Sequence, residues 1–148
     1  MLIGIGILFE SFTDTQTSIN KSTPQIEGTW KLLSTQKIVT NDTTYTNYSN
    51  NISGIKIINN NHFAFFQHDL NKGKDSSIAK FSSGGDKHTL QGNHYIEFLE
   101  YCGSRDWEGH TFDFTVLIKN NNLIQTGIEK IPDLGIERAI IETYTRIK

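Results

Sequence analysis

Segment 95–102 carries the residues whose types and spacing could do chemistry. If the segment is a β-strand, Tyr95, Glu97 and Tyr101 share one face, because alternate residues of a strand point to the same side. A carboxylate on an otherwise apolar face is costly to bury unless it is hydrogen-bonded. On an inward face, Glu97 with Tyr95 or Tyr101 would therefore fix the polar end of an apolar ligand.

Two alternatives to this ligand-binding role remain open, and the first arises because the sequence does not decide which face of the strand points inward. With the opposite parity, Ile96, Phe98 and Cys102 point inward and Glu97 lies on the surface. The other alternative is a small enzyme in which Glu97 works with Tyr95 or His110 as an acid–base group.

Other polar and aromatic side chains could line the same interior. Trp107 lies in a loop where an indole could cover the mouth of a cavity or simply anchor the loop. The polar candidates, at strand ends or within an aromatic strand, are His62, Gln67, His110 and Gln125. The aromatic candidates, which would form both core and cavity wall, are Phe63, Phe65, Phe66, Phe112 and Phe114.

The sequence offers little support for catalysis or for a cofactor. It contains neither a nucleophile elbow nor a His-Glu-x-x-His motif, and Gly84-Gly85 precedes a strand-like segment, unlike a phosphate-binding loop. The five histidines have no recognisable metal-ligand spacing. We therefore expect no catalytic set, no metal and no cofactor. A formal charge of −2 without a Lys/Arg block also argues against nucleic acid as a partner.

The elements that must position these residues read as strands. The run 28–39 predicts a first strand with Trp30, Leu32 and Ser34 on one face and Lys31, Thr35 and Lys37 toward water. Segment 40–51 is rich in Asn, Thr and Tyr and is expected to be an exposed loop. The further strands are expected at 52–58, 62–69, 78–82, 87–90, 95–102, 112–118, 123–130 and 136–147, with turns at 59–61, 84–85, 91–93, 120–122 and 132–135.

This pattern predicts an all-β fold of about nine strands and no amphipathic helix. Sequential hairpins make antiparallel neighbours, and closing the sheet removes its exposed edges. We therefore predict an antiparallel up-and-down β-barrel of about 8–10 strands over residues 26–148; a jelly roll or two-sheet sandwich is the alternative. With 148 residues, one domain of this kind needs no disulfide, and the single Cys102 could not form one within the chain.

The first 25 residues differ from the rest. Met1–Phe9 is almost uninterruptedly apolar and is followed by small residues, as in a secretory signal, although no basic residue precedes it. The run is too short to span a bilayer, so we expect no transmembrane span. Residues 14–25 are expected to be a flexible linker. Export is therefore expected; an N-terminal strand or a wrongly chosen start codon is the alternative.

Several motifs carry a resemblance to known proteins. Gly28-Thr-Trp-Lys-Leu resembles the first-strand Gly-x-Trp signature of lipocalins and the wider calycin superfamily. Further segments resemble a bacterial group of lipocalin-like domains of unknown function, over residues 26–148 in all. These are Lys56-Ile-Ile, Asn61–Asp69, Gly84-Gly85, Thr89-Leu90 with Gly92, Tyr95-Ile-Glu97, Glu100-Tyr101, Leu123–Gly127 and Glu142–Arg146.

The resemblance implies a structural signature and a function. Calycin barrels resemble one another in a first-strand Trp capped by an Arg from the last strand, here Trp30 under Arg146. The implied function is an exported protein that binds a small apolar or amphipathic molecule inside the barrel. Two alternatives remain: a packed barrel without a ligand that serves as a structural or interaction module, and the small enzyme using Glu97.

Overall fold

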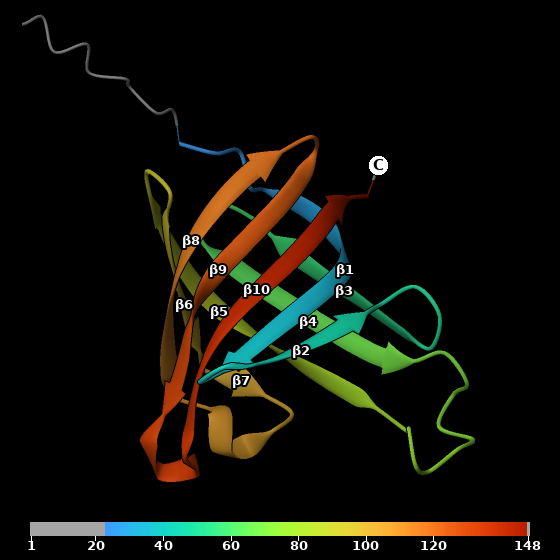
Figure 1. The fold of residues 1–148 in the computed structure, drawn as a ribbon. Helices are drawn as coiled ribbons and strands as arrows, with labels where there is room; N and C mark the ends of the chain where they lie inside the picture. Colours follow the sequence, from blue (N-terminus) through green and yellow to red (C-terminus); the bar gives the residue numbers. More distant parts are fainter. Residues whose placement is uncertain (1–22, 148) are drawn as a thin grey trace, which may run out of the picture.

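The chain forms a β-barrel in the computed structural model, which describes residues 23–147 (Figure 1). Ten strands and two short 3-10 helices make up this part of the chain. The strands are β1 (Gly28–Val39), β2 (Asp42–Asn47), β3 (Ile52–Ile58), β4 (His62–Asp69), β5 (Phe81–Gln91), β6 (His94–Leu99), β7 (Tyr101–Cys102), β8 (His110–Lys119), β9 (Asn122–Ile131) and β10 (Ile136–Arg146). The 3-10 helices are η1 (Arg105–Trp107) and η2 (Pro132–Leu134).

The sheet closes on itself, which confirms the predicted antiparallel barrel. Each strand pairs with its neighbour in the order β10-β9-β8-β6-β5-β4-β3-β1, and β10 then pairs with β1, so that eight strands form a closed cylinder. The closing ladder runs from Trp30 opposite Arg146 to Ile38 opposite Ala139. Strands β2 and β7 lie outside this ring and pair with β1 and β5. Closure removes the exposed edges that an open sheet would leave.

Short turns connect the strands, as their residue types predict. Asn120 and Asn121 both have positive φ, at 51° and 63°, in the hairpin between β8 and β9. Asn tolerates this left-handed conformation better than most residues, so an Asn run between two β-prone segments makes a tight hairpin. The hairpins β3–β4 and β5–β6 also lie where the sequence predicts them.

The first strand departs from strict alternation. The register between β1 and β10 shifts between Leu32 and Ser34, as in a β-bulge. A bulge inserts one residue and reverses which side chains point inward. Trp30 and Leu32 are buried as predicted, but Thr35 is also buried, and Lys37 borders the interior. The prediction that Thr35 and Lys37 face water was therefore wrong.

The predicted loop at 40–51 contains a strand. Asp42–Asn47 forms β2, which pairs with the second half of β1 and is largely exposed. Its threonines have high β-propensity. The segment does not alternate between apolar and polar residues, so the pattern that predicts a half-buried strand was absent. The chain then turns inward at Tyr48, whose side chain is buried.

The start of β5 also differs from the prediction. No strand covers 78–80; β5 begins at Phe81 and runs through Gly84 and Gly85, which were predicted to form a turn. A Cβ on Gly85 would meet the backbone of Phe63 and Ala64 on β4, so this glycine permits close approach of two strands.

One end of the barrel is sealed around Trp30. Its side chain is fully buried, and its Nε1 donates a hydrogen bond of 2.7 Å to the Ile26 carbonyl. The Arg146 guanidinium lies 4.2 Å from the indole centroid and donates to the carbonyls of Gln25 (2.7 Å) and Glu27 (2.5 Å). The predicted Trp30–Arg146 pair is therefore confirmed. Gly28 has φ of +137°, and a side chain there would collide with Arg146.

Two sequence predictions lie partly or wholly outside this description. The signal-like segment and most of the linker, within 1–25, fall outside residues 23–147. Within the described residues, no helix combines the length and apolar character needed to cross a membrane.

Candidate functional site

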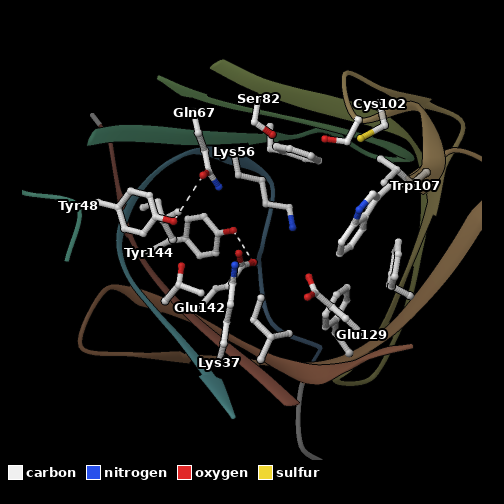
Figure 2. A pocket seen from close by; sticks show the side chains of 18 of the residues that line it. Lys37, Tyr48, Lys56, Gln67, Ser82, Cys102, Trp107, Glu129, Glu142 and Tyr144 are labelled. Atoms are coloured by element: carbon white, nitrogen blue, oxygen red, sulfur yellow. Dashed lines mark hydrogen bonds between the residues drawn. The ribbon is translucent and has the colours of Figure 1, made fainter. Parts of the chain in front are cut away.

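A cavity of about 250 Å³ lies inside the barrel, and its lining residues on β1, namely Leu32, Thr35 and Lys37, follow Trp30 toward the other end of that strand. Figure 2 shows labelled side chains from several strands pointing into it. The apolar and aromatic residues lining it are Leu32, Ile55, Phe65, Leu99, Trp107, Phe112, Phe114 and Ile140. The others are Thr35, Lys37, Tyr48, Lys56, Gln67, Lys80, Ser82, Cys102, Ser104, Glu129, Arg138, Glu142 and Tyr144. The cavity thus joins an aromatic wall to an unusually charged one.

A buried polar cluster forms the inner boundary of the cavity. Lys56 on β3 forms an ion pair with Glu97 on β6 and donates a hydrogen bond of 2.8 Å to Gln125 Oε1 on β9. Gln125 Nε2 lies 3.5 Å from Glu97 Oε1 and donates to it. All three residues are at least nine-tenths buried. Because each charge has a partner of opposite sign, the cluster avoids the cost of an isolated buried charge.

Three aromatic rings surround the same ammonium group. Lys56 Nζ lies 5.3 Å from the Phe63 ring centroid, 5.5 Å from that of Tyr95 and 5.7 Å from that of Tyr144. Cations are attracted to aromatic faces at such distances. These rings and the Glu97 ion pair hold the Lys56 side chain across the barrel and separate the cavity from the sealed end.

Glu142 on β10 is a carboxyl group that borders the cavity. Its Oε2 accepts a hydrogen bond of 2.7 Å from the Tyr144 hydroxyl, drawn as a dashed line in Figure 2. Burial raises the pKa of Glu142, although the Lys56 charge acts in the opposite direction. Burial and the Glu142 charge also raise the pKa of Tyr144, so this phenol remains a donor. Glu142 is therefore the cavity residue best suited to hold or exchange a proton.

The cavity wall near η1 is built around Trp107. The Arg138 guanidinium lies 5.5 Å from the Trp107 ring centroid, and Arg138 Nε donates to Glu129 Oε2 at 2.5 Å. Trp107 also packs on Phe112, with ring centroids 5.7 Å apart. Figure 2 shows the indole directed into the cavity.

The opposite side of the cavity carries uncharged polar groups. The Tyr48 hydroxyl donates a long hydrogen bond of 3.4 Å to Gln67 Oε1. Thr35 Oγ1 is buried and makes no hydrogen bond with the described part of the chain. Buried hydroxyl groups without a partner are uncommon, because they lose their contacts to water without replacement.

The structure divides the predicted ligand-binding residues into groups. Five of them line the cavity, namely Phe65, Gln67, Trp107, Phe112 and Phe114. Four others are buried in the layer beneath it, namely Phe63, Tyr95, Glu97 and Gln125. The inward parity of Tyr95 and Glu97 is therefore the correct one, but Glu97 is held by Lys56 and does not border the cavity.

The remaining four predicted residues lie elsewhere. His62 and Phe66, both on β4, are exposed. Tyr101 is 68% exposed and points away from the interior, contrary to the face it was predicted to share with Glu97. The strand is interrupted at Glu100, between β6 and β7, so the parity changes and Cys102 borders the cavity instead. His110 lies behind the wall, with Nδ1 3.2 Å from the Trp107 carbonyl oxygen.

Sequence reasoning missed several residues of the site. Lys37, Lys56, Lys80, Arg138 and Glu142 all border the cavity, although charged residues in a strand usually mark its solvent face. Lys56 gave one usable signal, because it is a lone charge within the apolar run Ile55–Ile58. The others depend on which strands the closed barrel brings together.

Comparison with protein-family models and with curated proteins found no match to this chain. The class that the fold defines is a closed eight-stranded antiparallel β-barrel, consistent with a calycin-like architecture. Over residues 23–147, no group of three or more His, Cys, Asp or Glu side chains is placed to hold a metal ion.

Proposed function

We propose that this protein binds a small amphipathic molecule in the cavity at the open end of its barrel. The observation that carries the proposal is the cavity itself, which joins an aromatic wall to a polar one. Drug-sized ligands occupy pockets of roughly 300–1,000 Å³. A cavity of about 250 Å³ therefore favours a ligand smaller than these.

The sealed end supports binding rather than passage through the barrel. Trp30 and Arg146 close the far end, and the Lys56 cluster lies between it and the cavity. A molecule in the cavity would enter and leave by the same end. Trp107 stands beside this route, where its ring could stack on a bound molecule.

A packed module without a ligand is a weaker proposal. A fully packed interior has few voids larger than a water molecule. A cavity of about 250 Å³ corresponds to roughly eight waters at about 30 Å³ each. The aromatic and charged side chains around it also exceed what closure of the barrel requires.

An acid–base enzyme is the second candidate, with a different residue from the one predicted. Glu97 is held in its ion pair with Lys56, whereas Glu142 borders the cavity and has a raised pKa. A carboxyl group with a raised pKa holds its proton to a higher pH than an ordinary one, which suits it to proton exchange. Under this second proposal, Glu142 would exchange a proton with the bound molecule and Tyr144 would position the carboxyl group.

Native mass spectrometry of the purified protein tests the proposed function. We expect a co-purified molecule, or stoichiometric binding of a member of a panel of small aromatic and short-chain amphipathic compounds. Recovery of the bound molecule with unchanged mass supports binding, and a changed mass supports the enzyme. Absence of any bound compound across the panel would contradict both.

Export is part of the same proposal and has its own test. The apolar run Met1–Phe9 and the polar segment after it support it. N-terminal sequencing of protein isolated from its natural source should find a chain that starts near Asp14. An intact Met1 on the folded protein would contradict export by cleavage.

A further inference from the structure

The charges that border the cavity do not balance. Two of its cations have partners within the described residues: Lys56 pairs with Glu97, and Arg138 pairs with Glu129. Glu142 is the remaining carboxyl group of the wall, and burial favours its neutral form. Among residues 23–147, Lys37 and Lys80 are therefore left without a carboxylate partner.

Lys37 and Lys80 border the same cavity. Lys37 comes from the second half of β1, where the bulge directs it inward, and Lys80 immediately precedes β5. Neither forms an ion pair with any residue among 23–147. Burial lowers the pKa of Lys80, and the Lys37 charge lowers it further. Two cations that disfavour one another in this way would both be stabilised by an anion between them.

The position of Lys80 is fixed by its neighbours in the fold. Asp69 Oδ2 accepts a hydrogen bond of 2.9 Å from the Lys80 backbone N–H, and Oδ1 accepts one of 2.7 Å from Gly73. These bonds hold the loop between β4 and β5 against the barrel. The ammonium group of Lys80 is thus carried on a braced segment rather than on a free loop.

Uncharged donors border the cavity as well. Thr35 Oγ1 is buried without a hydrogen-bond partner in the described chain. Ser82 follows Lys80 on β5 and also borders the cavity. A carboxylate has about four lone-pair sites, so it can accept from two ammonium groups and a hydroxyl at once. The aromatic side chains that border the cavity, Phe65, Phe112 and Phe114, would contact an apolar body.

We propose that the ligand is a small organic anion, a single-ring or short-chain carboxylate whose charged group lies between Lys37 and Lys80. This inference rests on the proposed function and specifies its ligand class. The aromatic wall holds the ring, and the Thr35 hydroxyl donates to the carboxylate. The cavity volume of about 250 Å³ is too small to enclose a long acyl chain.

Matched probes of equal shape test the inference. Phenylacetate and phenylacetamide share their ring and spacer and differ in charge. We expect phenylacetate to bind at least about tenfold more tightly than the amide, a difference of about 1.4 kcal/mol. Isothermal titration calorimetry measures both affinities. Quenching of Trp107 fluorescence locates the binding, because Trp30 is fully buried at the other end and Trp107→Phe should remove the response.

Single-charge variants then locate the anion. Lys37→Met and Lys80→Met should each weaken phenylacetate binding about tenfold and leave phenylacetamide unchanged. Lys31→Met is the matched control, because Lys31 is an exposed residue of the same strand β1. Circular dichroism and thermal unfolding of each variant establish that it is folded. Salt should weaken phenylacetate binding to the unsubstituted protein and to Lys31→Met more than to Lys37→Met or Lys80→Met.

The outcomes separate this inference from the proposed function. Equal affinities for the two probes, both abolished by blocking the cavity with Ser82→Trp, would overturn the anion and leave the binding function standing. Loss of phenylacetate binding in Lys31→Met as much as in Lys37→Met would overturn the assigned position. Failure of every small aromatic probe to bind the folded protein would overturn both proposals.

Discussion

The two ends of the barrel are built from the same strands but serve different purposes. At the sealed end, the Trp30 indole, the Arg146 guanidinium and the carbonyls around them satisfy one another. At the open end, Lys37 and Lys80 lack carboxylate partners and Thr35 Oγ1 lacks any partner in the described chain. Satisfied polar groups indicate a structural role, whereas unsatisfied ones bordering a cavity indicate that something else completes them.

The layer between the two ends is where the largest effect is expected. Glu97→Leu leaves the buried Lys56 ammonium without its counter-charge and should lower the free energy of unfolding by about 3–5 kcal/mol. Urea denaturation of the variant measures this loss. The double variant Lys56→Met with Glu97→Leu should recover most of the stability, because both buried charges are then removed. A double variant as unstable as the single one would show that the ion pair is not the cause.

The sealed end should respond to loss of its cap by a smaller amount. Arg146→Ala removes the cation over the Trp30 ring and two hydrogen bonds to carbonyls, at a cost of about 2 kcal/mol. Thermal unfolding measures the change, and Arg146→Lys should recover only part of it because an ammonium group cannot reproduce the planar fork. An unchanged melting temperature in Arg146→Ala would refute the structural role of the pair.

The open end should show its effect in pH dependence. Burial raises the pKa of Glu142 above its ordinary value of 4.5, so between the two values the folded protein holds more protons than the unfolded chain. Stability should therefore fall as pH rises through this interval. Glu142→Gln should remove this fall in stability. Above the pH interval in which Glu142 titrates, the variant should be more stable than the unsubstituted protein. Urea denaturation of both proteins across about pH 4–8, which spans the ordinary carboxyl and histidine pKa values, measures stability against pH. Parallel curves for the two proteins would contradict a raised pKa of Glu142.

Two neighbouring ion pairs between β9 and β10 give the smallest effect and an internal comparison. Glu129–Arg138 is partly buried at the cavity, whereas the side chains of Lys130 and Glu137 are 58% and 67% exposed. Exposed pairs contribute about 0–1 kcal/mol. Glu137→Gln should therefore change stability by less than about 0.5 kcal/mol, and Arg138→Met should cost more. Double-mutant cycles on both pairs measure the difference; equal coupling energies would mean that the cavity side offers no special environment.

Sequence patterns predicted most of the fold. The alternation of Phe112, Phe114 and Val116 with polar residues located β8, and the Asn turns located two hairpins. The prediction failed where a local rule was broken. β2 lacks apolar alternation, and Gly84-Gly85 provides space between strands instead of a turn.

The candidate site was predicted only in part. Five residues proposed from the sequence border the cavity, namely Phe65, Gln67, Trp107, Phe112 and Phe114. Tyr101 was misplaced, because the interruption at Glu100 reverses the parity of the strand beyond Leu99. The charged residues of the cavity were missed altogether. A charge in a strand is read as exposed unless its partner is known, and that partner lies on another strand.

The sequence by itself determined the all-β class, the turns and the Gly28-Thr29-Trp30 motif, because these depend on residues close together in the chain. Only the tertiary structure decided the site. Lys56 meets Glu97 and Gln125 across 41 and 69 residues, and a single bulge in β1 brings Lys37 inward. Closure of the barrel determines these contacts, and closure depends on all eight strands together.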